Sequence, residues 1–261
     1  MDTSGQLSPL AIERCLAILR EFADTRSQYA PEKIAVVGTA ALRVASNSAD
    51  FIKPAEEILG TEIEIIAGER EASLVHTAVA NSMTDLPDPL LIVDVGGAST
   101  ELIFGTRATI ERLVSLPIGA VRLAERHLTS DPPTVSQQQT LLDDIDAHLS
   151  QFDVPKLKAF VGTAGTATSI AAMELELDTY DAERVHGFKI QAGVLNASLA
   201  RLFTLSCEER RRLPGLEAAR ADVILAGAAI YQRLFALTDA ETMYTGDRGV
   251  RWGLTYELLG F

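Results

Sequence analysis

The first third of the chain alternates between helical and strand-like hydrophobic patterns. Ser8 followed by Pro9 marks a helix start, and apolar residues then recur at helical spacing to about residue 28. Short apolar runs at 34–37 and 63–67 predict buried strands, and helices are predicted at 49–59 and 69–82. Strands that alternate with helices are typical of a parallel sheet in an α/β protein.

After residue 89 the pattern changes. Strand-like runs at 90–95, 100–104 and 109–116, separated by short turns, predict an antiparallel meander. The elements predicted after it are helices near 121–128 and 135–149, a strand at 159–161, a helix from about 166, a long helical insertion, a strand at 242–244 and a closing helix to 259.

This second part repeats the helix and strand order of the first part, with three strands added at its front. We therefore expect two domains, residues 1–74 and 75–261, around a cleft. Such a duplicated ribonuclease-H-like unit makes the actin-like ATPase fold. The first domain is then truncated at its N-terminal side, because its opening three strands are missing.

A turn of small residues connects two of the predicted strands. Asp94 ends an apolar strand, Gly96, Gly97, Ala98 and Ser99 form the turn, and Glu101 lies in the next strand. Small residues let backbone N–H groups approach phosphate oxygens, and carboxylates are suitable ligands for Mg²⁺ or Mn²⁺. The turn leads into a strand, so it is neither a Walker A nor a dinucleotide-binding loop. An ordinary glycine hairpin is the alternative.

A second turn contains Gly162, Thr163, Gly165 and Thr166 and runs from a strand into a helix. The free N–H groups and the dipole of a helix start favour an anion. Taken alone, this turn is equally well explained as a connecting loop. Paired with the first turn, it predicts a second phosphate-binding segment.

Other polar residues receive structural interpretations. Cys15 lies at helical spacing among apolar residues, which predicts a buried thiol, and Cys207 forms no metal-binding motif with it. The four histidines also lack metal-ligand spacing, so they carry no assigned role. Arg210–Arg212 is interpreted as a solvated helix face.

Charge and composition narrow the function classes. The net charge of −13 argues against broad binding to nucleic acids or anionic membranes, which it would repel. A polyanionic substrate would have to be bound locally, by backbone amides, a few arginines and a bridging metal ion. Because the sequence shows neither a signal-peptide pattern nor an apolar run of about 20 residues, we expect a cytoplasmic protein.

Seven spaced blocks resemble the exopolyphosphatase / guanosine pentaphosphate phosphohydrolase (Ppx/GppA phosphatase) family, in the family's order and over nearly the whole chain. The blocks are Gly5–Ser8, Val37–Asn47, Ala67–Ala72, Asp94–Glu101, Leu116–Leu123, Gly162–Thr166 and Asp247–Arg251.

The resemblance implies roles for particular residues. Glu71 would be the general base for an attacking water, and Asp94 and Glu101 the acidic pair at the metal ion and the water. Gly97 and Ser99 would belong to the phosphate loop. Arg43 would be a basic residue that faces the cleft from the first domain. The implied substrates are inorganic polyphosphate and guanosine pentaphosphate, and the family suggests a homodimer.

The sequence departs from the family at two places. Ala98 stands where the family usually has a third glycine, and a left-handed backbone there would cost an alanine about 1 to 2 kcal/mol. The family's opening strands, with a facing phosphate loop, have no counterpart before Ser8. The first domain would then have a two-stranded sheet with an unpaired edge, and the position of the true start would be in question.

Three functions therefore compete. The first is a metal-dependent phosphohydrolase, and the second is an actin-like kinase for a small metabolite. The third is a module that binds phosphate without turnover, because the first phosphate loop is missing. The sequence does not separate polyphosphate from guanosine pentaphosphate, since both present a terminal phosphoanhydride.

Overall fold

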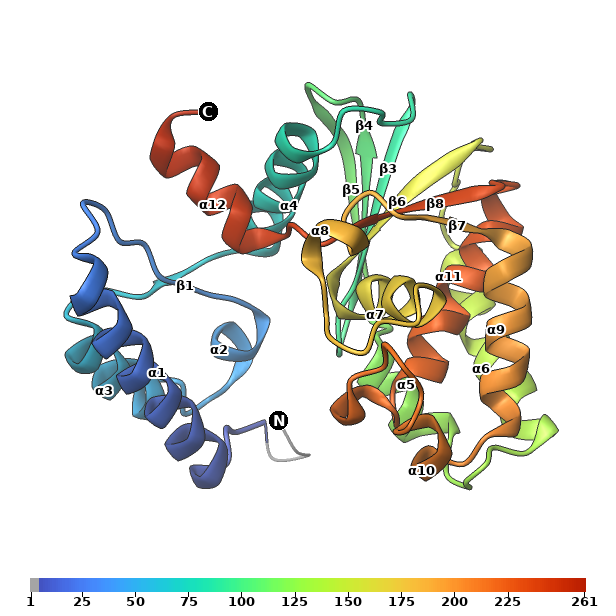
Figure 1. Cartoon of the computed structure of the whole chain (residues 1–261), viewed down its shortest axis with the longest axis horizontal. Helices are drawn as coiled ribbons and strands as arrows, with labels where there is room; N and C mark the ends of the chain where they lie inside the picture. Colours follow the sequence, from blue (N-terminus) through green and yellow to red (C-terminus); the bar gives the residue numbers. More distant parts are fainter. Residues whose placement is uncertain (1–4) are drawn as a thin grey trace. The chain divides into compact units, whose positions relative to one another are not determined.

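The computed structural model describes residues 5–261. Within them the chain forms two compact units (Figure 1). Unit 1 comprises the residues up to Ser73 together with Glu257–Phe261, and unit 2 comprises Leu74–Tyr256. The boundary falls inside helix α4 (Gly68–Ser82), so this helix begins in unit 1 and ends in unit 2.

Unit 1 contains a sheet of two short parallel strands. Strands β1 (Val37–Gly38) and β2 (Glu64–Ile65) confirm the predicted parallel pairing. Both are shorter than predicted, because only these residues are paired with the neighbouring strand. The helices of this unit are α1 (Pro9–Tyr29), α2 (Ala40–Val44), α3 (Ala49–Leu59) and the start of α4, and of these α2 was not predicted.

Helix α1 corrects the prediction of a buried thiol. Its start is capped as predicted, with the Ser8 hydroxyl accepting from the N–H of Ala11 at 3.2 Å. The helix packs against α3, yet none of its residues is fully buried and Cys15 is exposed. The half-buried apolar positions are Ile12, Leu16, Leu19 and Ala23. Cys15 lies beside that stripe, on the solvent side.

Unit 2 is built on a six-stranded mixed sheet with the order β5-β4-β3-β6-β8-β7. The predicted meander is confirmed, since β3 (Leu90–Val95), β4 (Thr100–Gly105) and β5 (Ile110–Leu116) are antiparallel neighbours. Strands β6 (Ala159–Thr163) and β8 (Thr242–Gly246) continue the sheet parallel to β3. The edge strand β7 (Lys189–Gln191) was missed, because three residues inside a helical region give too short a pattern.

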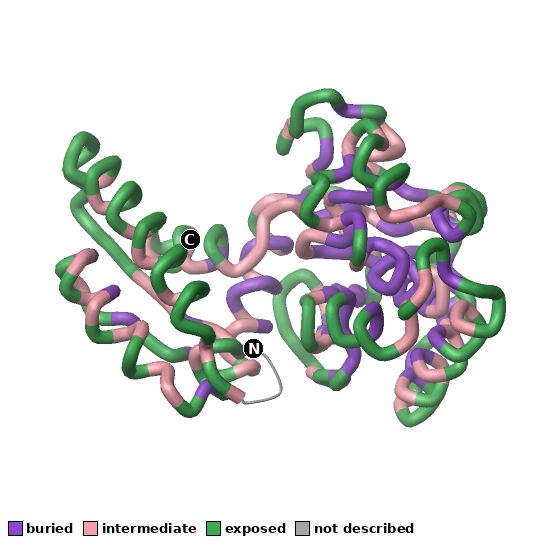
Figure 2. The backbone as a smooth tube through the Cα atoms, turned by 90° about the horizontal axis from the view of Figure 1, so that it is seen from below, coloured by how far each residue is buried: buried purple, intermediate pink, exposed green. Residues whose placement is uncertain are grey.

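The helices of unit 2 enclose its hydrophobic core. Their bounds are α5 (Ala120–His127), α6 (Val135–Leu149), α7 (Ala164–Glu174), α8 (Ala182–Val185), α9 (Ala192–Thr204), α10 (Cys207–Arg210), η1 (Ala218–Arg220) and α11 (Ile224–Thr238). Helix α12 (Val250–Leu259) begins in unit 2 and ends in unit 1. Helix α11 is the most buried of them and contacts α5, α6, α7 and α9. Figure 2 shows the buried segments concentrated in unit 2.

None of the helices formed by residues 5–261 is long and apolar enough to cross a membrane.

Candidate active site

One row of residues crosses the sheet of unit 2 at the ends of its parallel strands. From β5 to β8 the row is Ser115, Glu101, Asp94, Thr163 and Gly246, each paired in register with the next. Ligand sites in open α/β sheets form outside the carboxyl ends of the parallel strands. The row therefore marks the edge of unit 2 at which a site is expected.

Asp94 and Glu101 form a carboxylate pair within this row. They stand opposite each other on β3 and β4, and both are partly exposed. Glu101 accepts a hydrogen bond from the Ser115 hydroxyl at 2.9 Å. No group of three or more metal-binding side chains occurs among the described residues. A pair is nonetheless suitable for Mg²⁺ or Mn²⁺, because these ions use one or two carboxylates and complete their shell with water and phosphate oxygens.

The turn between β3 and β4 presents unpaired N–H groups. Its hairpin is closed by the N–H of Gly96, which donates to the carbonyl of Ser99 at 3.0 Å. The N–H groups of Gly97, Ala98 and Ser99 donate to no other atom of residues 5–261, and Gly97 and Ala98 are exposed. Successive free N–H groups of this kind make an anion-binding concavity.

The carbonyl groups of this turn point the other way, into the start of helix α5. Gly96 accepts from the N–H of Ala120 at 2.9 Å, and Gly97 accepts from those of Val121 and Arg122 at 3.0 Å each. These bonds satisfy amides that have no partner within the helix. They also fix the orientation of the turn, so that its N–H groups remain available.

Gly119 permits this close contact. A Cβ at Gly119 would lie 2.6 Å from both the carbonyl carbon and oxygen of Gly97, and 2.7 Å from the carbonyl carbon of Ala98. Backbone atoms cannot move aside as a flexible side chain can. The block Leu116–Leu123 marked this segment in the sequence, but its role in supporting the turn could not be recognised from the sequence.

The backbone strain expected at Ala98 is absent. Ala98 does not have a positive φ, so the alanine there carries no left-handed penalty. A left-handed backbone occurs instead at Ala164, at the start of α7, with a φ of 63°. Non-glycine residues in this region are uncommon and concentrate at functional sites.

The second predicted phosphate turn is only partly available to a ligand. Gly162 is buried, and a Cβ there would lie 2.6 Å from the sulfur of Met243. The side chains of Thr163 and Thr166 are also buried. The side chains of Thr163 and Thr166 and the backbone of Gly162 are therefore packed inside unit 2, and binding of substrate by the backbone of this turn stays a prediction. Gly165 alone of the predicted set lines the neighbouring cavity.

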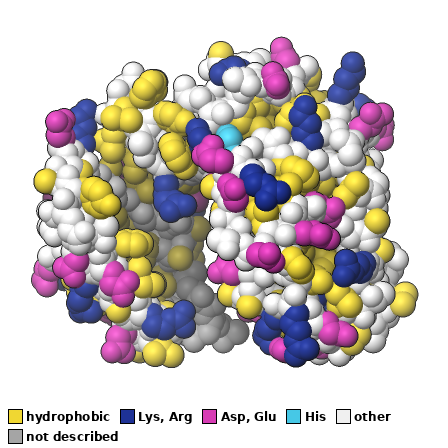
Figure 3. All heavy atoms as spheres, in the orientation of Figure 1, with side chains coloured by type: hydrophobic (Ala, Val, Ile, Leu, Met, Phe, Trp, Pro, Cys, Tyr) yellow, Lys and Arg dark blue, Asp and Glu magenta, His cyan; other side chains and the backbone are white. Residues whose placement is uncertain are grey.

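This cavity has a volume of about 470 Å³ and opens beside Asp94. Most of its lining was not predicted to be functional, and its walls carry charges of both signs. Figure 3 shows acidic and basic side chains similarly interspersed on the displayed face of unit 2. The lining residues used below are Asp94, Ala164, Gly165, Tyr180, Arg220 and Asp247.

Tyr180 and Arg220 shape the cavity. Burial, and then a hydrogen bond to Asp247, raise the pKa of Tyr180, so its hydroxyl stays protonated at neutral pH. A Cβ on Gly165 would overlap the guanidinium of Arg220, so the absence of a side chain admits this cation. The block Asp247–Arg251 pointed to one wall of the cavity, whereas Tyr180 and Arg220 gave no recognisable sequence signal.

Arg210 contradicts the prediction of a solvated arginine run. Its side chain is only 4% exposed, with Nε donating to the carbonyl of Ala221 at 2.8 Å and Nη1 to that of Leu205 at 2.6 Å. The next two arginines pair with Glu208 at the surface, as a solvated face would. Arg210 thereby holds the segment that follows Arg220.

His186 also has a structural role that the sequence did not reveal. Its Nδ1 accepts from the N–H of Asp247 at 3.3 Å, so the proton is on Nε2, which donates to the carbonyl of Ser82 at 3.2 Å. The imidazole therefore connects helix α4 to the loop that carries Asp247.

Two predicted residues belong to unit 1. Arg43 lies on α2 and Glu71 in the first turn of α4. Their side chains approach to 3.9 Å, and Arg43 also donates to the carbonyl of Ile66 at 2.6 Å. Both are about one-third exposed, at 35% and 30%. Within unit 1 the structure therefore places the predicted base beside the predicted basic residue.

The carboxylate pair and the amide-rich turn are typical of α/β proteins that bind phosphate groups. Comparison with known proteins agrees with that class. The chain matches the model of the Ppx/GppA phosphatase family over residues 1–260. Exopolyphosphatase 2 of Mycobacterium tuberculosis is 30% identical over 243 residues, which are 90% of this chain and 76% of that protein.

Solved structures give the same result. A Ppx/GppA family member from Aquifex aeolicus matches with a TM-score of 0.87 and 30% identity, covering 98% of this chain and 84% of its own. An exopolyphosphatase from Cytophaga hutchinsonii shares the fold, with a TM-score of 0.89 at 23% identity over 98% of this chain and 84% of its own.

The chain belongs to the Ppx/GppA phosphatase family, as its motifs predicted. It is therefore an α/β protein of a phosphohydrolase family. The comparisons do not confirm the expected truncation, because the chain covers most of the length of these relatives.

Proposed function

We propose that this protein is a metal-dependent phosphohydrolase that releases terminal phosphate from inorganic polyphosphate or guanosine pentaphosphate by means of an activated water. The observation that carries the proposal is the pairing of Asp94 with Glu101 next to the free N–H groups of residues 97–99. Likeness to a protein named exopolyphosphatase 2 supports polyphosphate as substrate. The motif resemblance supports guanosine pentaphosphate.

Residues of unit 2 would hold the phosphate. The N–H groups of Gly97, Ala98 and Ser99 would donate to oxygens of the terminal phosphate, and the Ser99 hydroxyl adds a further donor. Asp94 and Glu101 would hold Mg²⁺ or Mn²⁺. When bound, such an ion neutralises negative charge that develops on the transferred group. These local donors act against an unfavourable net charge of −13.

Glu71 is the proposed general base, with Arg43 as a basic residue for phosphate oxygens. The carboxylate takes a proton from water, and the water oxygen bonds to the terminal phosphorus. The bond from that phosphorus to the bridging oxygen then breaks, and the shortened polyphosphate or guanosine tetraphosphate leaves. No covalent enzyme intermediate is needed.

The test is phosphate release from each substrate, with and without Mg²⁺ or Mn²⁺. We expect metal-dependent release, and a loss of roughly 10²- to 10⁴-fold in kcat for Glu71→Ala, because that is the usual contribution of a general base. Glu69→Ala is the matched control, since Glu69 lies in the same first turn of α4 and is exposed. Activity that survives Glu71→Ala would remove Glu71 from the mechanism.

The same assay separates the competing functions. Phosphorylation of a small metabolite by ATP, without release of phosphate from polyphosphate, would favour a kinase. Binding of polyphosphate without turnover would favour a phosphate-binding module. Release from only one of the two substrates would identify the preferred one.

A further inference from the structure

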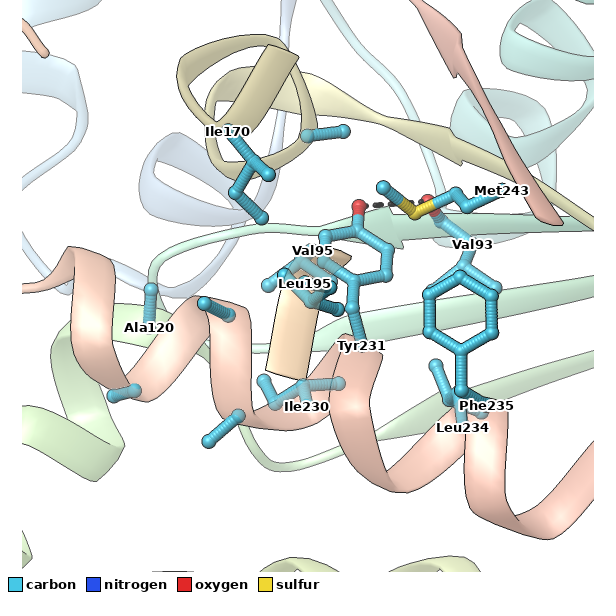
Figure 4. Packing of buried hydrophobic residues seen from close by; sticks show 14 of the residues in the cluster. Val93, Val95, Ala120, Ile170, Leu195, Ile230, Tyr231, Leu234, Phe235 and Met243 are labelled. Carbon is cyan, nitrogen blue, oxygen red and sulfur yellow. Dashed lines mark hydrogen bonds between the residues drawn. The ribbon is translucent and has the colours of Figure 1, made fainter. Parts of the chain in front are cut away.

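A buried tyrosine lies directly beneath the edge of the sheet that carries Asp94. Tyr231 comes from α11, is completely buried and stacks on Phe160 with 6.4 Å between ring centroids. Figure 4 shows its hydroxyl directed at the carbonyl of Val93. The hydroxyl oxygen lies 2.9 Å from the carbonyl oxygen of Thr163 and 3.3 Å from that of Val93.

The two carbonyl groups belong to neighbouring parallel strands. Val93 immediately precedes Asp94 on β3, and Thr163 ends β6. Asp94 and Thr163 are partners in the register. Through one shared hydrogen the hydroxyl thus links Val93, two residues before the end of β3, with Thr163, the last residue of β6. At this place β3 leads to the carboxylate pair and β6 leads to the cavity.

Packing alone does not explain a tyrosine here. The residues around it on α11 are almost all apolar or small and buried, and a phenylalanine would fill the same volume. A hydroxyl group in such surroundings is costly unless it is hydrogen-bonded. The hydroxyl is therefore better explained by the two carbonyl groups it contacts.

The ring has little freedom to move. A Cβ at Gly162 on β6 would lie 3.0 Å from Cε1 of Tyr231, so the ring rests directly on the strand backbone. Burial, and then the negative charge of Asp94, raise the pKa of Tyr231 well above its ordinary value. The hydroxyl accordingly remains a hydrogen-bond donor at neutral pH.

We propose that Tyr231 is a positioning residue whose hydroxyl sets the spacing between the Asp94 carboxylate on β3 and the start of α7, where Ala164 and Gly165 line the cavity. This inference rests on the proposed function, in which Asp94 holds the metal ion. Loss of the hydroxyl would loosen the two strand ends and weaken metal binding, although the side chain touches neither the ion nor the substrate.

The test is Tyr231→Phe, which keeps the ring and removes the hydroxyl. The dissociation constant for Mn²⁺ is measured by electron paramagnetic resonance, and the half-saturating Mg²⁺ concentration is measured in the phosphate-release assay. We expect both concentrations to rise roughly tenfold, which is the lower end of the range for groups that support metal ligands indirectly. The control is Phe235→Leu in the same aromatic cluster, where Phe235 lies 4.8 Å from Phe160 between ring centroids.

Phe235→Leu should lower the melting temperature and leave Mn²⁺ affinity unchanged. An equal loss of Mn²⁺ affinity in both variants would overturn the positioning role, because general loosening of the core would then explain it. Wild-type Mn²⁺ affinity in Tyr231→Phe would overturn only this role. A wild-type protein that binds no Mn²⁺ would overturn the metal-dependent function as well.

Discussion

Asp94 on β3 lies directly opposite Glu101 on β4, so two carboxylates face each other across neighbouring antiparallel strands. Side chains paired in this way have Cβ atoms about 4.5 to 5.5 Å apart, and like charges there are destabilising. The Ser115 hydroxyl satisfies one oxygen of Glu101 but adds no positive charge. By itself this pairing of like charges is unfavourable, and a divalent cation between the two carboxylates would offset it.

Asp94→Asn should separate function from stability. We expect phosphate release to fall at least about hundredfold, because the proposed metal ligand is lost. The free energy of unfolding in urea, without metal, should stay level or rise, because like-charge repulsion is removed. Glu111→Gln, at an exposed position of β5, is the control and should change neither quantity. Undiminished activity in Asp94→Asn would exclude Asp94 as a metal ligand.

Gly119→Ala should displace the phosphate turn. The added Cβ would overlap the backbone of Gly97, and the repacking should cost about 1 to 3 kcal/mol of stability. A turn moved by about 1 Å should lower kcat/KM by up to about hundredfold. Gly193→Ala on α9 is the control, because no atom beyond the neighbouring residues and the backbone of its own helix lies within 4 Å of the added methyl group. It should stabilise the helix by about 0.5 to 1 kcal/mol with normal turnover.

Replacing Ala98 or Ala164 with glycine should have opposite effects on stability. Ala164 has a left-handed backbone, so glycine there removes about 1 to 2 kcal/mol of strain from the folded state. Glycine also raises the conformational entropy of the unfolded chain, which offsets about half of this gain in stability. Ala98 has no such strain, and glycine should destabilise it by about 0.5 to 1 kcal/mol. Urea midpoints measure both changes. A gain in stability from Ala98→Gly would show that this position prefers a left-handed backbone.

Asp144 should contribute to acid sensitivity. Burial raises its pKa, but hydrogen bonds from His127 and Arg126 outweigh burial and hold the pKa of Asp144 below its usual range. A carboxylate with a lowered pKa stabilises the fold above its unfolded pKa of about 3.9, and this stability is lost as the pH falls through the folded pKa. Asp144→Asn should therefore lower the melting temperature at pH 7. Below about pH 4 the melting temperature of this variant should fall less steeply with decreasing pH than that of the wild type.

Asp143→Asn is the control for this pH dependence. Asp143 is the neighbouring residue on α6, and its carboxylate accepts a hydrogen bond only from Gln139, at 2.7 Å, among the described residues. The variant should keep the acid response of the wild-type protein. Identical pH profiles for Asp144→Asn and the wild type would contradict the prediction.

Much of the fold could be predicted because its signals are local. The helix at Pro9–Tyr29 has a serine cap and a proline at its start, and the strands of the meander are apolar runs bounded by turn residues. The carboxylates Asp94 and Glu101 flank a turn of four small residues with one strand residue on either side, so their pairing across the hairpin follows from six intervening residues. Such features depend on neighbours in the sequence.

The remaining features depend on residues that are distant in the sequence. Gly162 and Gly97 both occur in glycine-containing turns. Gly162 is needed because the side chains of Tyr231 and Met243 leave no room for a Cβ, whereas Gly97 is exposed beside α5. Arg210 belongs to a basic run, yet its side chain is buried and donates a hydrogen bond to the carbonyl of Ala221. Pattern alone does not indicate which partner a residue will meet.

By itself, the sequence determined the family, the α/β class, the order of most elements and the acidic pair, since these follow from spaced motifs and hydrophobic periodicity. The tertiary structure decided which of the predicted residues face the cavity and which are packed. It also revealed that Gly119 admits the turn between β3 and β4, that Arg210 holds the segment after Arg220, and that Tyr231 links β3 with β6. The physical reason is that burial and hydrogen bonding depend on contacts between distant segments, which form only when the chain folds.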